Sequence, residues 1–552
     1  MTALSTAAGE PFELVEVEIE SDGRRIRAFK NAPASLRAIW DASAAHGDTP
    51  YLVYDAERYS YRGAHEIVAA LAQQLSDEHG VVPGDRLAIA MRNYPEWAFS
   101  FWAATSLGAV VVPLNAWWTG PELAYGLADS GTKVLLTDGE RFERLEPHLG
   151  GTSVKAVILA RAEGVNGSVH MWDDVIAAGS PSYELPALDI RPDDDATIMY
   201  TSGTTGRPKG AVGTHRNAAG HIMNAMYAGA SRASSAPAAP GRPVTLLTFP
   251  LFHVGGLQSF LLPYTVIGGT IVLLYRWDAV RALELIEREG VNNVAGVPTT
   301  MFELLDAARQ QGKDLSSLAG VASGATLVPP ELVRRIDSQL AHRAAPTNGY
   351  GLTETSGAAI ANAGRDYLER PDSVGTPISP AMEVRIADVD GKALPVGETG
   401  EIWIKGPTVF RGYFNNEEAT TAAITDGWFH TGDAGRLDDD GYLYVVDRLK
   451  DVIVRGGENV YAAEVEAVLY EHQDVAEAAI VGLPDDRYGE QVVAIVRLRP
   501  DSTADGDALR AHVAGQLAAF KVPSVVHITP DSLPRNAAGK VLKRELRDTL
   551  PT

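Results

Sequence analysis

The run YTSGTTGRPKG, from Tyr200 to Gly210, gathers four Ser or Thr hydroxyls, three glycines and two cations into eleven residues. Glycine lets backbone N–H groups turn toward an anion, hydroxyls donate further hydrogen bonds, and Lys209 adds a positive charge. The run therefore predicts a polyphosphate-binding loop. It is not a Walker P-loop, because Gly210 rather than Ser or Thr follows the lysine. An ordinary Gly- and Thr-rich surface turn is the alternative, and it does not explain the hydroxyl density.

Four later segments carry further candidate residues: NGYGLTET from Asn348 to Thr355, HTGD from His430 to Asp433, DRLKD from Asp447 to Asp451, and PRNAAGK from Pro534 to Lys540. Each alone has a simpler explanation. A Thr-Glu pair can cap a helix, a charge run can be a solvated linker, and a lone lysine is usually exposed. The order of the five motifs argues against coincidence. From about residue 30 to 545 the chain resembles the adenylate-forming superfamily of acyl-CoA synthetases, luciferases and nonribosomal-peptide adenylation domains.

The resemblance implies a role for each motif. Tyr350 would lie against adenine, Thr353 would contact phosphate, and Glu354 would hold Mg²⁺, a hard cation that prefers oxygen ligands. Asp433 would accept hydrogen bonds from both ribose hydroxyls, which a carboxylate can do at once. Arg448 would also reach the nucleotide. The segment SGAT from Ser323 to Thr326 is similar to a segment that lines the adenine and acyl pocket.

The full set of residues implied by the resemblance falls into six groups. The catalytic group is Lys540, Lys209, Thr353 and Glu354, and the metal ligands are Thr201 and Glu354. The ATP- or AMP-binding group is Thr201, Ser202, Gly203, Thr204, Thr205, Gly206, Lys209, Gly324, Ala325, Asn348, Gly349, Tyr350, Thr353, Asp433, Arg448 and Lys540. The hinge is Lys450, and coenzyme A would pass Gly456 and Gly457. The acyl pocket would be lined by His253, Gly255, Val297, Gly324, Gly349 and Gly351.

In the implied first step, a substrate carboxylate attacks the α-phosphorus of ATP. Two unit charges about 4 Å apart repel by about 4 kcal/mol at an effective dielectric constant near 20. Mg²⁺ on Glu354, together with Lys209 and Lys540, would neutralise that repulsion and the charge on leaving pyrophosphate. No protein nucleophile is needed, which fits a chain with no cysteine.

In the implied second step, a thiol attacks the mixed anhydride, and Lys540 has to make way for it. The C-terminal domain would rotate about the hinge and present GGEN, from Gly456 to Asn459. Two positions depart from the superfamily pattern. Val454 stands where some relatives have a lysine, and the residues before Gly539 differ from the more usual Thr-containing version.

The acyl substrate is expected to be hydrophobic. PLFHVGG, from Pro250 to Gly256, resembles the motif beside the acyl pocket and has no acid that could bind an α-ammonium group. The glycines of the pocket would leave a roomy, mostly apolar tunnel for a fatty acid or a hydrophobic cyclic or aromatic acid. The alternatives are that His253 is a packed core histidine and that the glycines only serve turns.

The favoured function is an ATP-dependent carboxylic acid:CoA ligase that uses ATP, Mg²⁺ and coenzyme A, with a fatty acid as the expected substrate. A stand-alone acyl-AMP ligase that loads a carrier protein is the second hypothesis. A non-catalytic nucleotide or acyl sensor is the third, although Lys209, Glu354, Asp433 and Lys540 are all intact. Luciferase-type oxidation uses the same first half-reaction, and the motifs do not exclude it.

The elements that must position these residues follow from periodicity. From Tyr51 to about Ala160, and again after Ala196, short β-branched runs alternate with helical patterns, which predicts parallel sheets covered by helices. After Leu449 the pattern becomes α+β, with helices from about Ala462 to His472 and from about Gly506 to Ala519. The expected fold class is α/β: a large N-terminal domain of parallel-rich sheets flanked by helices, with a smaller β subdomain, and a small mobile C-terminal α+β domain.

The expected domains are an AMP-binding domain over 1–447, with 1–25 partly flexible, a hinge over 448–451 and a C-terminal lid over 452–552. A chain of 552 residues exceeds the size of a single core. Its formal net charge of −23 argues against a nucleic-acid partner. No secretory signal is apparent, and residues 259–275 read as a buried helix, a turn and a strand rather than a membrane span. The sequence is compatible with a cytoplasmic location and with a homodimer.

Overall fold

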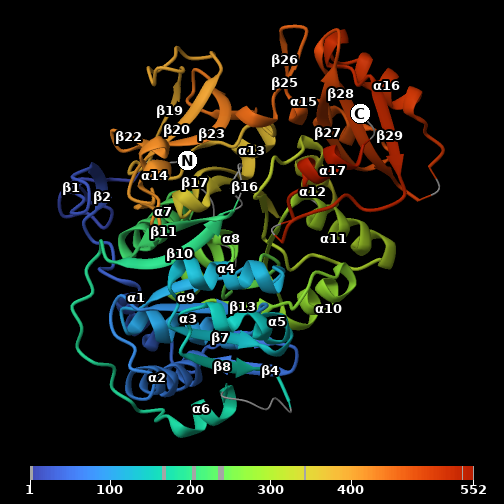
Figure 1. Ribbon diagram of the computed structural model, residues 1–552. Helices are drawn as coiled ribbons and strands as arrows, with labels where there is room; N and C mark the ends of the chain where they lie inside the picture. Colours follow the sequence, from blue (N-terminus) through green and yellow to red (C-terminus); the bar gives the residue numbers. More distant parts are fainter. Residues whose placement is uncertain are drawn as a thin grey trace.

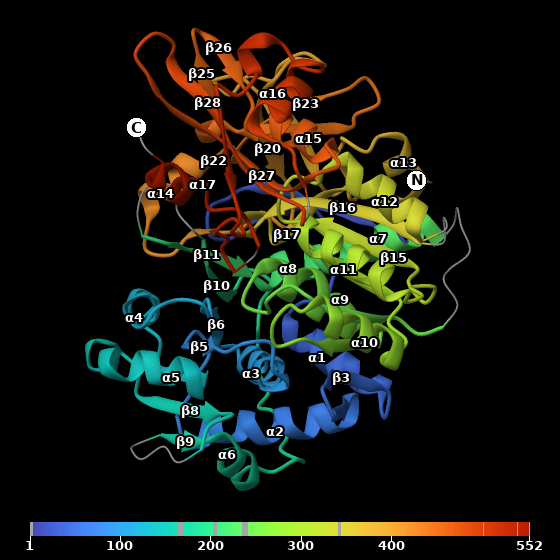
Figure 2. The ribbon, with the colours of Figure 1, turned by 90° about the vertical axis from the view of Figure 1, so that its right-hand side faces the viewer.

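The computed structural model describes residues 4–163, 169–201, 207–233, 241–340, 344–500, 502–537 and 539–550. Figure 1 shows a large body formed by the first two thirds of the chain, a strand-rich unit above it and a C-terminal unit at the upper right. Figure 2 shows the same C-terminal unit lying over the large body. The predicted α/β fold, with a β subdomain and a C-terminal α+β unit, is confirmed.

The first sheet of the large body has the order β21-β11-β10-β6-β5-β7-β8-β9. From β10 to β9 neighbouring strands are parallel, as expected for strands joined by helices. Its strands are β5 (Arg86–Ala90), β6 (Val110–Pro113), β7 (Val134–Asp138), β8 (Ala156–Ala160), β9 (His170–Met171), β10 (Asp195–Thr201), β11 (Lys209–Thr214) and β21 (Gly412–Tyr413).

The second sheet has the order β18-β17-β16-β15-β14-β12-β13-β3-β4. Its strands from β16 to β3 are parallel, and the strands at its two edges pair antiparallel. They are β3 (Pro50–Tyr54), β4 (Glu57–Ser60), β12 (Val244–Leu247), β13 (Thr270–Leu273), β14 (Asn293–Gly296), β15 (Gly320–Gly324), β16 (Ala345–Leu352), β17 (Gly357–Ala363) and β18 (Thr376–Pro377).

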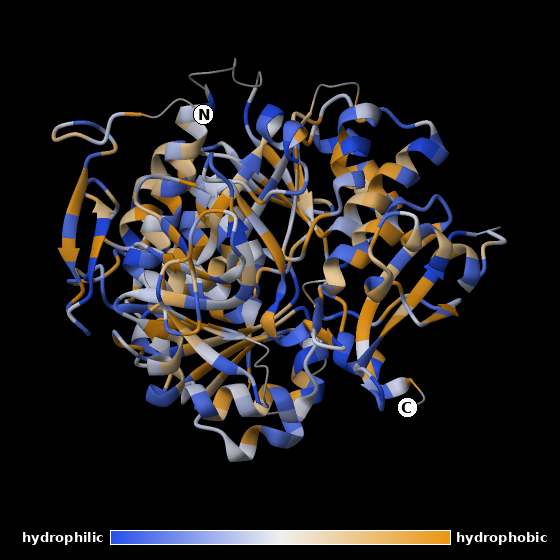
Figure 3. Cartoon of the chain, turned by 90° about the horizontal axis from the view of Figure 1, so that it is seen from above, coloured by the Kyte–Doolittle hydropathy of each residue, from blue (hydrophilic) through white to orange (hydrophobic). Residues whose placement is uncertain are grey.

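Helices cover both sheets. Those of the large body are α1 (Leu36–Ser43), α2 (Tyr61–Asp77), α3 (Pro95–Ser106), α4 (Gly120–Ser130), α5 (Gly139–Leu145), α6 (Trp172–Ala178), α7 (His215–Ala233), α8 (Val254–Gly256), α9 (Leu262–Val266), α10 (Ala279–Glu289), α11 (Pro298–Gln311), α12 (Pro330–Gln339) and α13 (Gly364–Glu369). The most extensive core joins α1, α2 and α3 to strands of both sheets, and within it Trp40 stacks on Trp102 with ring centroids 5.0 Å apart. Figure 3 shows the apolar residues concentrated along the inner strands.

Two smaller sheets complete the chain. The β subdomain contains β19 (Glu383–Ala387), β20 (Gly400–Lys405), β22 (Ile424–Thr425), β23 (Trp428–Leu437) and β24 (Leu443–Arg448), with α14 (Glu417–Ala423). The C-terminal unit contains β25 (Ile453–Arg455), β26 (Glu458–Val460), β27 (Val475–Asp485), β28 (Gly489–Leu498) and β29 (Val525–Thr529), with α15 (Ala462–Glu471), α16 (Gly506–Ala514) and α17 (Lys543–Thr549). A separate hairpin is formed by β1 (Leu14–Glu18) and β2 (Arg25–Phe29), and it begins within the stretch 1–25 that was predicted to be partly flexible.

The apolar stretch 259–275 forms part of a π-helix, then α9, a turn at Gly268 and Gly269, and β13. The interpretation as buried helix, turn and strand is therefore confirmed. Within the described residues, the structure contains no helix long and apolar enough to cross a membrane.

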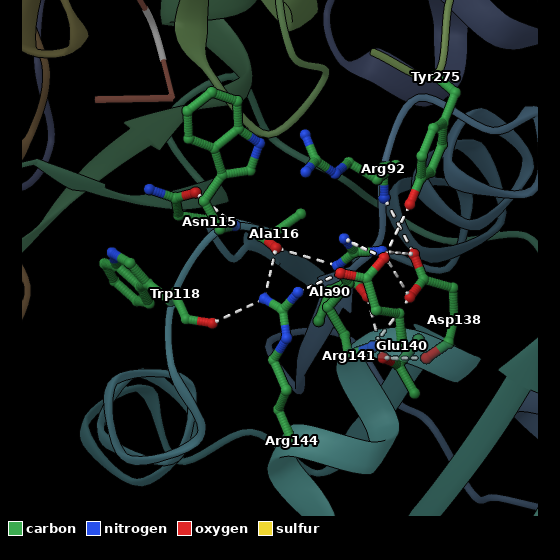
Figure 4. Close-up of polar contacts among 12 residues, drawn as sticks. Ala90, Arg92, Asn115, Ala116, Trp118, Asp138, Glu140, Arg141, Arg144 and Tyr275 are labelled. Atoms are coloured by element: carbon green, nitrogen blue, oxygen red, sulfur yellow. Dashed lines mark hydrogen bonds and ion pairs between the residues drawn. The ribbon is translucent and has the colours of Figure 1, made fainter. Parts of the chain in front are cut away.

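A buried ion pair ties together the loops that follow β5, β6 and β7 (Figure 4). Arg141 bonds both carboxylate oxygens of Asp138 at 3.0 Å and donates to the carbonyl of Ala116 at 2.9 Å. The backbone N–H of Arg92 donates to the same carboxylate at 3.2 Å. Burial raises the pKa of Asp138 although Arg141 opposes the shift. Removing one partner would leave a buried charge, which typically costs about 3–5 kcal/mol, so this cluster is structural.

Candidate active site

Three residues predicted to bind the nucleotide meet at Asp433. Asp433 in β23 lies opposite Arg448 in the antiparallel pair with β24, and Tyr350 comes from β16. The Tyr350 hydroxyl donates to Asp433 Oδ2 at 2.6 Å, and Arg448 Nε lies 2.7 Å from Oδ1. Burial and the neighbouring carboxylate raise the pKa of Tyr350 well above its usual value, so its hydroxyl is a neutral donor. The Asp433 carboxylate is therefore buried and held in one orientation, and such a group can accept hydrogen bonds from two hydroxyls.

A second group joins Glu354 to Lys209 through Tyr413. Glu354 lies on a short 3-10 turn, η4 (Thr353–Thr355), directly after β16. The Tyr413 hydroxyl donates to Glu354 Oε1 at 2.8 Å, and Lys209 Nζ lies 5.0 Å from the centroid of the Tyr413 ring. Burial raises the pKa of Glu354, while the hydrogen bond from Tyr413 opposes the rise. A cation bound here would favour the ionised carboxylate.

The phosphate loop begins and ends on paired strands. Thr201 at the end of β10 pairs with Lys209 at the start of β11, and its hydroxyl donates to the Lys209 carbonyl at 3.5 Å. Ser202, Gly203, Thr204, Thr205 and Gly206 lie outside the described residues. The hairpin places Lys209 beside the Glu354 turn, which brings two predicted catalytic residues to one place.

Lys540 reaches this site from the C-terminal unit. Its backbone N–H donates to the Asn536 side chain at 2.9 Å, and Arg535 bonds the Gly539 carbonyl at 2.8 Å, so the turn that carries it is fixed. Burial and the positive charge of Arg448 lower the pKa of Lys540 to about 8, whereas Asp433 opposes the shift. The side chain therefore lies among the charges of the nucleotide group.

The turn before Lys540 touches the large body. Gly539 has a φ of +82°, and a side chain there would come within 2.7 Å of the Val297 side chain at the start of α11. Glycine is therefore required twice, by its backbone conformation and by this close approach. Val297, predicted to line the acyl pocket, is thus adjacent to the turn that carries Lys540.

The strand ends near the predicted adenine site are closely packed. Ser323 pairs with Asn348 and Gly324 with Gly349, and Ala325 follows in the left-handed region with a φ of +64°. A Cβ on Gly324 would lie 3.0 Å from the Gly349 carbonyl oxygen. Glycine at this position serves the close approach of β15 and β16.

Of the predicted acyl residues, His253 and Gly255 lie at α8, and the predicted glycines differ in how much room they leave. The half-buried His253 precedes α8, and its Nδ1 accepts from the Gly255 N–H at 3.2 Å. Burial lowers the pKa of His253 to about 4, so the ring is neutral near pH 7. A Cβ on Gly351 would collide with the Gly357 carbonyl, so this glycine serves strand packing. At Gly255 a Cβ would only contact the Phe249 ring at 3.4 Å.

The structure does not bring the predicted coenzyme A residues to Lys540. Gly456 and Gly457 form the exposed turn between β25 and β26, which projects away from the large body in Figure 1. Lys450 is exposed on the short turn η5 (Leu449–Asp451) between β24 and β25. A cavity of about 480 Å³ lies elsewhere, between α1, α2 and residues 181–185, and contains none of the predicted site residues.

Sequence motifs missed Tyr413, which links Glu354 to Lys209. It lies 59 positions after Glu354, and its only local signal is an aromatic residue beside glycine in the run RGYF. Tyr413 reaches the site because β21 pairs with β11. This contact joins segments far apart in sequence, so no local sequence pattern predicts it.

Comparisons with known proteins identify the family of this chain. The AMP-binding enzyme family matches residues 39–414, and the AMP-binding enzyme C-terminal domain matches residues 464–540. A feruloyl-CoA synthase of Amycolatopsis sp is 38% identical over 503 residues, covering 91% of this chain and 94% of that protein. The long-chain-fatty-acid–CoA ligase FadD13 of Mycobacterium tuberculosis is 34% identical over 487 residues, covering 87% and 91%.

Among solved structures, the anthranilate CoA ligase AuaEII in complex with anthranoyl-AMP superposes with a TM-score of 0.84 at 25% identity, covering 92% of this chain and 96% of that one. The two family matches, the sequence relatives and the fold therefore indicate the same family. The chain belongs to the AMP-binding, adenylate-forming enzyme family, and its sequence relatives include acid–CoA ligases.

Proposed function

We propose that this chain is an ATP-dependent, AMP-forming ligase that joins a hydrophobic carboxylic acid to coenzyme A. The observation that carries the proposal is the position of Lys540, which enters from the C-terminal unit beside Asp433 and Arg448. A movable cation beside an oriented carboxylate suits a reaction in which an acid attacks ATP and a second nucleophile later replaces the lysine.

In adenylation, Asp433 would hold the ribose hydroxyls and Tyr350 would pack against adenine. Lys209 and Thr353 would bind phosphate oxygens, and Lys540 would offset the repulsion between the carboxylate and the α-phosphate. The bond formed joins a carboxylate oxygen to the α-phosphorus, and the bond broken releases pyrophosphate. Asn348, Gly349, Gly324 and Ala325 would border the adenine.

The residues present fit Mg²⁺ bound with ATP. No cluster of three or more acidic or His side chains suited to a metal occurs in the part of the chain that the structure describes, so a cage made by protein alone is absent there. Mg²⁺ usually takes one or two carboxylates and completes its shell with phosphates and water, which the buried Glu354 and the nearby Thr201 would allow. When bound, the ion would neutralise phosphate charge.

Thioester formation requires Lys540 to leave and the exposed turn at Gly456 and Gly457 to face the adenylate. Rotation of the C-terminal unit about Lys450 would make this exchange. The coenzyme A acceptor is supported by the sequence relatives, several of which are acid–CoA ligases. Transfer to a carrier protein is the competing acceptor for the same first step.

The proposal is tested by pyrophosphate release with ATP and Mg²⁺ over fatty, aryl and amino acids, each with and without coenzyme A, with products identified by mass. Acyl-CoA and AMP as the products support the ligase. Acyl-AMP that accumulates regardless of coenzyme A would favour a carrier-protein acceptor. No acid-dependent pyrophosphate from any acid would contradict the proposal and favour a sensor.

A further inference from the structure

A buried carboxylate of the C-terminal unit lies behind the turn that carries Lys540. Glu477 is the third residue of β27, and its side chain is only 3% exposed. Ionised side chains are rarely buried unless they are paired, because burial disfavours the charged form. None of the proposed reaction steps uses Glu477, so its burial needs another explanation.

Glu477 is paired by donors from two segments. The backbone N–H of Leu533 donates to Oε2 at 2.8 Å, and Arg497 Nε in β28 lies 3.3 Å from the same oxygen. Arg535 Nη2 donates to Oε1 at 3.2 Å. Burial would raise the pKa of Glu477, but the bonds from Leu533 and Arg497 and the charges of the two arginines lower it. Glu477 is therefore ionised near pH 7 and holds the segment that begins at Leu533.

Arg535 connects this carboxylate to the Lys540 turn. While its Nη2 bonds Glu477, its Nη1 donates to the carbonyl oxygen of Gly539 at 2.8 Å. Gly539 directly precedes Lys540, so one guanidinium joins the core of the C-terminal unit to the backbone beside the lysine. The guanidinium is planar and rigid, and it therefore holds its two acceptors in a fixed relation that a single ammonium group cannot impose.

The turn has a second set of bonds that acts only within it. The Lys540 N–H donates to the side chain of Asn536 at 2.9 Å, and the Asn536 N–H donates to the Lys540 carbonyl at 2.9 Å. These bonds fix the shape of the turn but do not place it relative to the rest of the unit. Its placement depends on the bonds from Leu533 and Arg535 to Glu477.

The placement of the turn matters because it also meets the large body. Ala537 packs against the core that joins α1, α2 and α3 to both sheets, and Gly539 approaches Val297. Figure 2 shows the red end of the chain descending from the C-terminal unit toward the large body. A shift of the turn would therefore move Lys540 relative to Asp433, which lies outside the C-terminal unit.

We infer that Glu477 and Arg535 are positioning residues for adenylation, which together hold the Lys540 turn so that its ammonium meets the reacting carboxylate and the α-phosphate. The inference rests on the proposed ligase function and adds two residues that act on the substrates only through Lys540. A misplacement of about 1 Å can cost about 10²-fold in rate, so an anchor behind the turn can control the reaction.

The test measures single-turnover acyl-AMP formation with ATP, Mg²⁺ and the acid of the test panel that wild type turns over fastest. Arg535→Met removes both bonds of the guanidinium, while Arg497 and Leu533 still pair Glu477. The maximal rate is expected to fall about tenfold, less than on removing Lys540 itself. The ATP concentration that gives half the maximal rate is expected to stay within about twofold, because the nucleotide group at Asp433 is unchanged.

Conservative variants separate positioning from general stability. Arg535→Lys keeps a positive charge toward Glu477 and is expected to recover part of the lost rate. Glu477→Gln removes the charge that holds Arg535 and is expected to reproduce the loss. Thermal unfolding of each variant shows whether it is folded at the assay temperature, and if Glu477→Gln is not, the two Arg535 variants decide the question.

A Lys540→Ala background shows whether the two residues act through the lysine. Adding Arg535→Met to Lys540→Ala is expected to change the rate of acyl-AMP formation by less than about twofold, because residues that act as one unit are not additive. A further loss of about tenfold in this double variant would mean that Arg535 acts independently of Lys540, which would overturn the inference.

Glu464→Gln is the matched control. It removes an ion pair of the same unit, in which Lys521 Nζ lies 2.6 Å from a Glu464 carboxylate oxygen of α15, and the rate is expected to stay within about twofold. Thioester formation from supplied acyl-AMP and coenzyme A should be retained in Arg535→Met, and a parallel loss would count against the inference.

A wild-type rate in Arg535→Met, or an equal loss in Glu464→Gln, would overturn the inference and leave the ligase intact. No acyl-AMP from wild type with any acid of the panel would overturn the proposed function as well.

Discussion

At the residue scale, the site depends on Asp433, whose two carboxylate oxygens are already bonded by Tyr350 and Arg448. Those bonds hold the carboxylate in a fixed orientation before substrate arrives, which lowers the cost of ordering it. Lys540 lies within the same group of charges and comes from the C-terminal unit. The residue-scale predictions therefore concern this lysine.

Lys540→Ala should reduce acyl-AMP formation by about 10²-fold or more, a loss typical of removing one group that stabilises developing charge. Thioester formation from supplied acyl-AMP should stay largely intact, because in the proposed second step Lys540 would have left the site. Single-turnover assays of the two half-reactions, with Lys540→Arg as the charge-retaining control, check this. An equal loss of rate in both half-reactions would contradict the assignment of Lys540 to the adenylation step alone.

The pH dependence of adenylation should report Lys540. Because its pKa is lowered to about 8, the side chain is protonated below pH 8 and loses its charge above it. The kcat/KM for ATP should therefore fall on the alkaline side with a midpoint near 8, since this parameter reports the free enzyme. In Lys540→Arg the alkaline fall in kcat/KM should move to higher pH. If the fall stays at the same pH, a group other than Lys540 causes it.

The motifs could locate most of the candidate site because each is contiguous in sequence. The structure brings Tyr350, Asp433, Arg448 and Lys540 together from segments almost 200 positions apart, as the resemblance implied. Tyr413 could not be found in this way. It joins the site only because β21 pairs with β11, and that pairing depends on the whole fold.

At the element scale, the periodicity of the sequence predicted whether a segment is a helix or a strand better than it predicted where the segment ends. The helix expected from about Ala462 to His472 is α15, over Ala462–Glu471. The helix expected to reach Ala519 ends at Ala514, with Gly515 as its C-cap, and a 3-10 turn follows at Ala519–Lys521. A glycine in the pattern was the available signal, since glycine commonly ends helices.

A substitution in the turn after β24 should affect the two half-reactions differently. Proline fixes φ near −65°, which a 3-10 turn already adopts, so Lys450→Pro should preserve the arrangement seen here and hinder rotation away from it. Adenylation should persist while thioester formation falls by about tenfold or more. Lys450→Ala is the control that leaves the backbone free, and unchanged overall turnover of Lys450→Pro would place the hinge elsewhere.

At the scale of the whole molecule, side chains of α11 and α12 hold the C-terminal unit in place. Tyr470 of α15 stacks on Phe302 with ring centroids 6.4 Å apart, and Arg499 bonds Asp306 at 3.0 Å. Arg334 of α12 lies 3.5 Å from Glu471. These contacts belong to the arrangement that brings Lys540 to the site, and rotation of the unit would break them.

Tyr470→Ala should therefore weaken the arrangement suited to adenylation. Aromatic pairs contribute about 0.5–1.5 kcal/mol beyond burial, so the population should shift by roughly two- to tenfold. Single-turnover acyl-AMP formation should slow by that factor, while thioester formation from supplied acyl-AMP is unchanged or faster. Arg62→Ala, which removes an exposed ion pair with Asp48 in the large body, is the control. Slowing of both steps together would mean general damage to the fold.

The central claim is that a substrate carboxylate attacks the α-phosphorus of ATP. Its most direct test supplies the accepted acid with both carboxylate oxygens labelled as ¹⁸O, together with ATP, Mg²⁺ and coenzyme A. The account predicts that each AMP released on thioester formation contains one ¹⁸O, alongside unlabelled pyrophosphate. Unlabelled AMP, or ADP and labelled phosphate in its place, would contradict it.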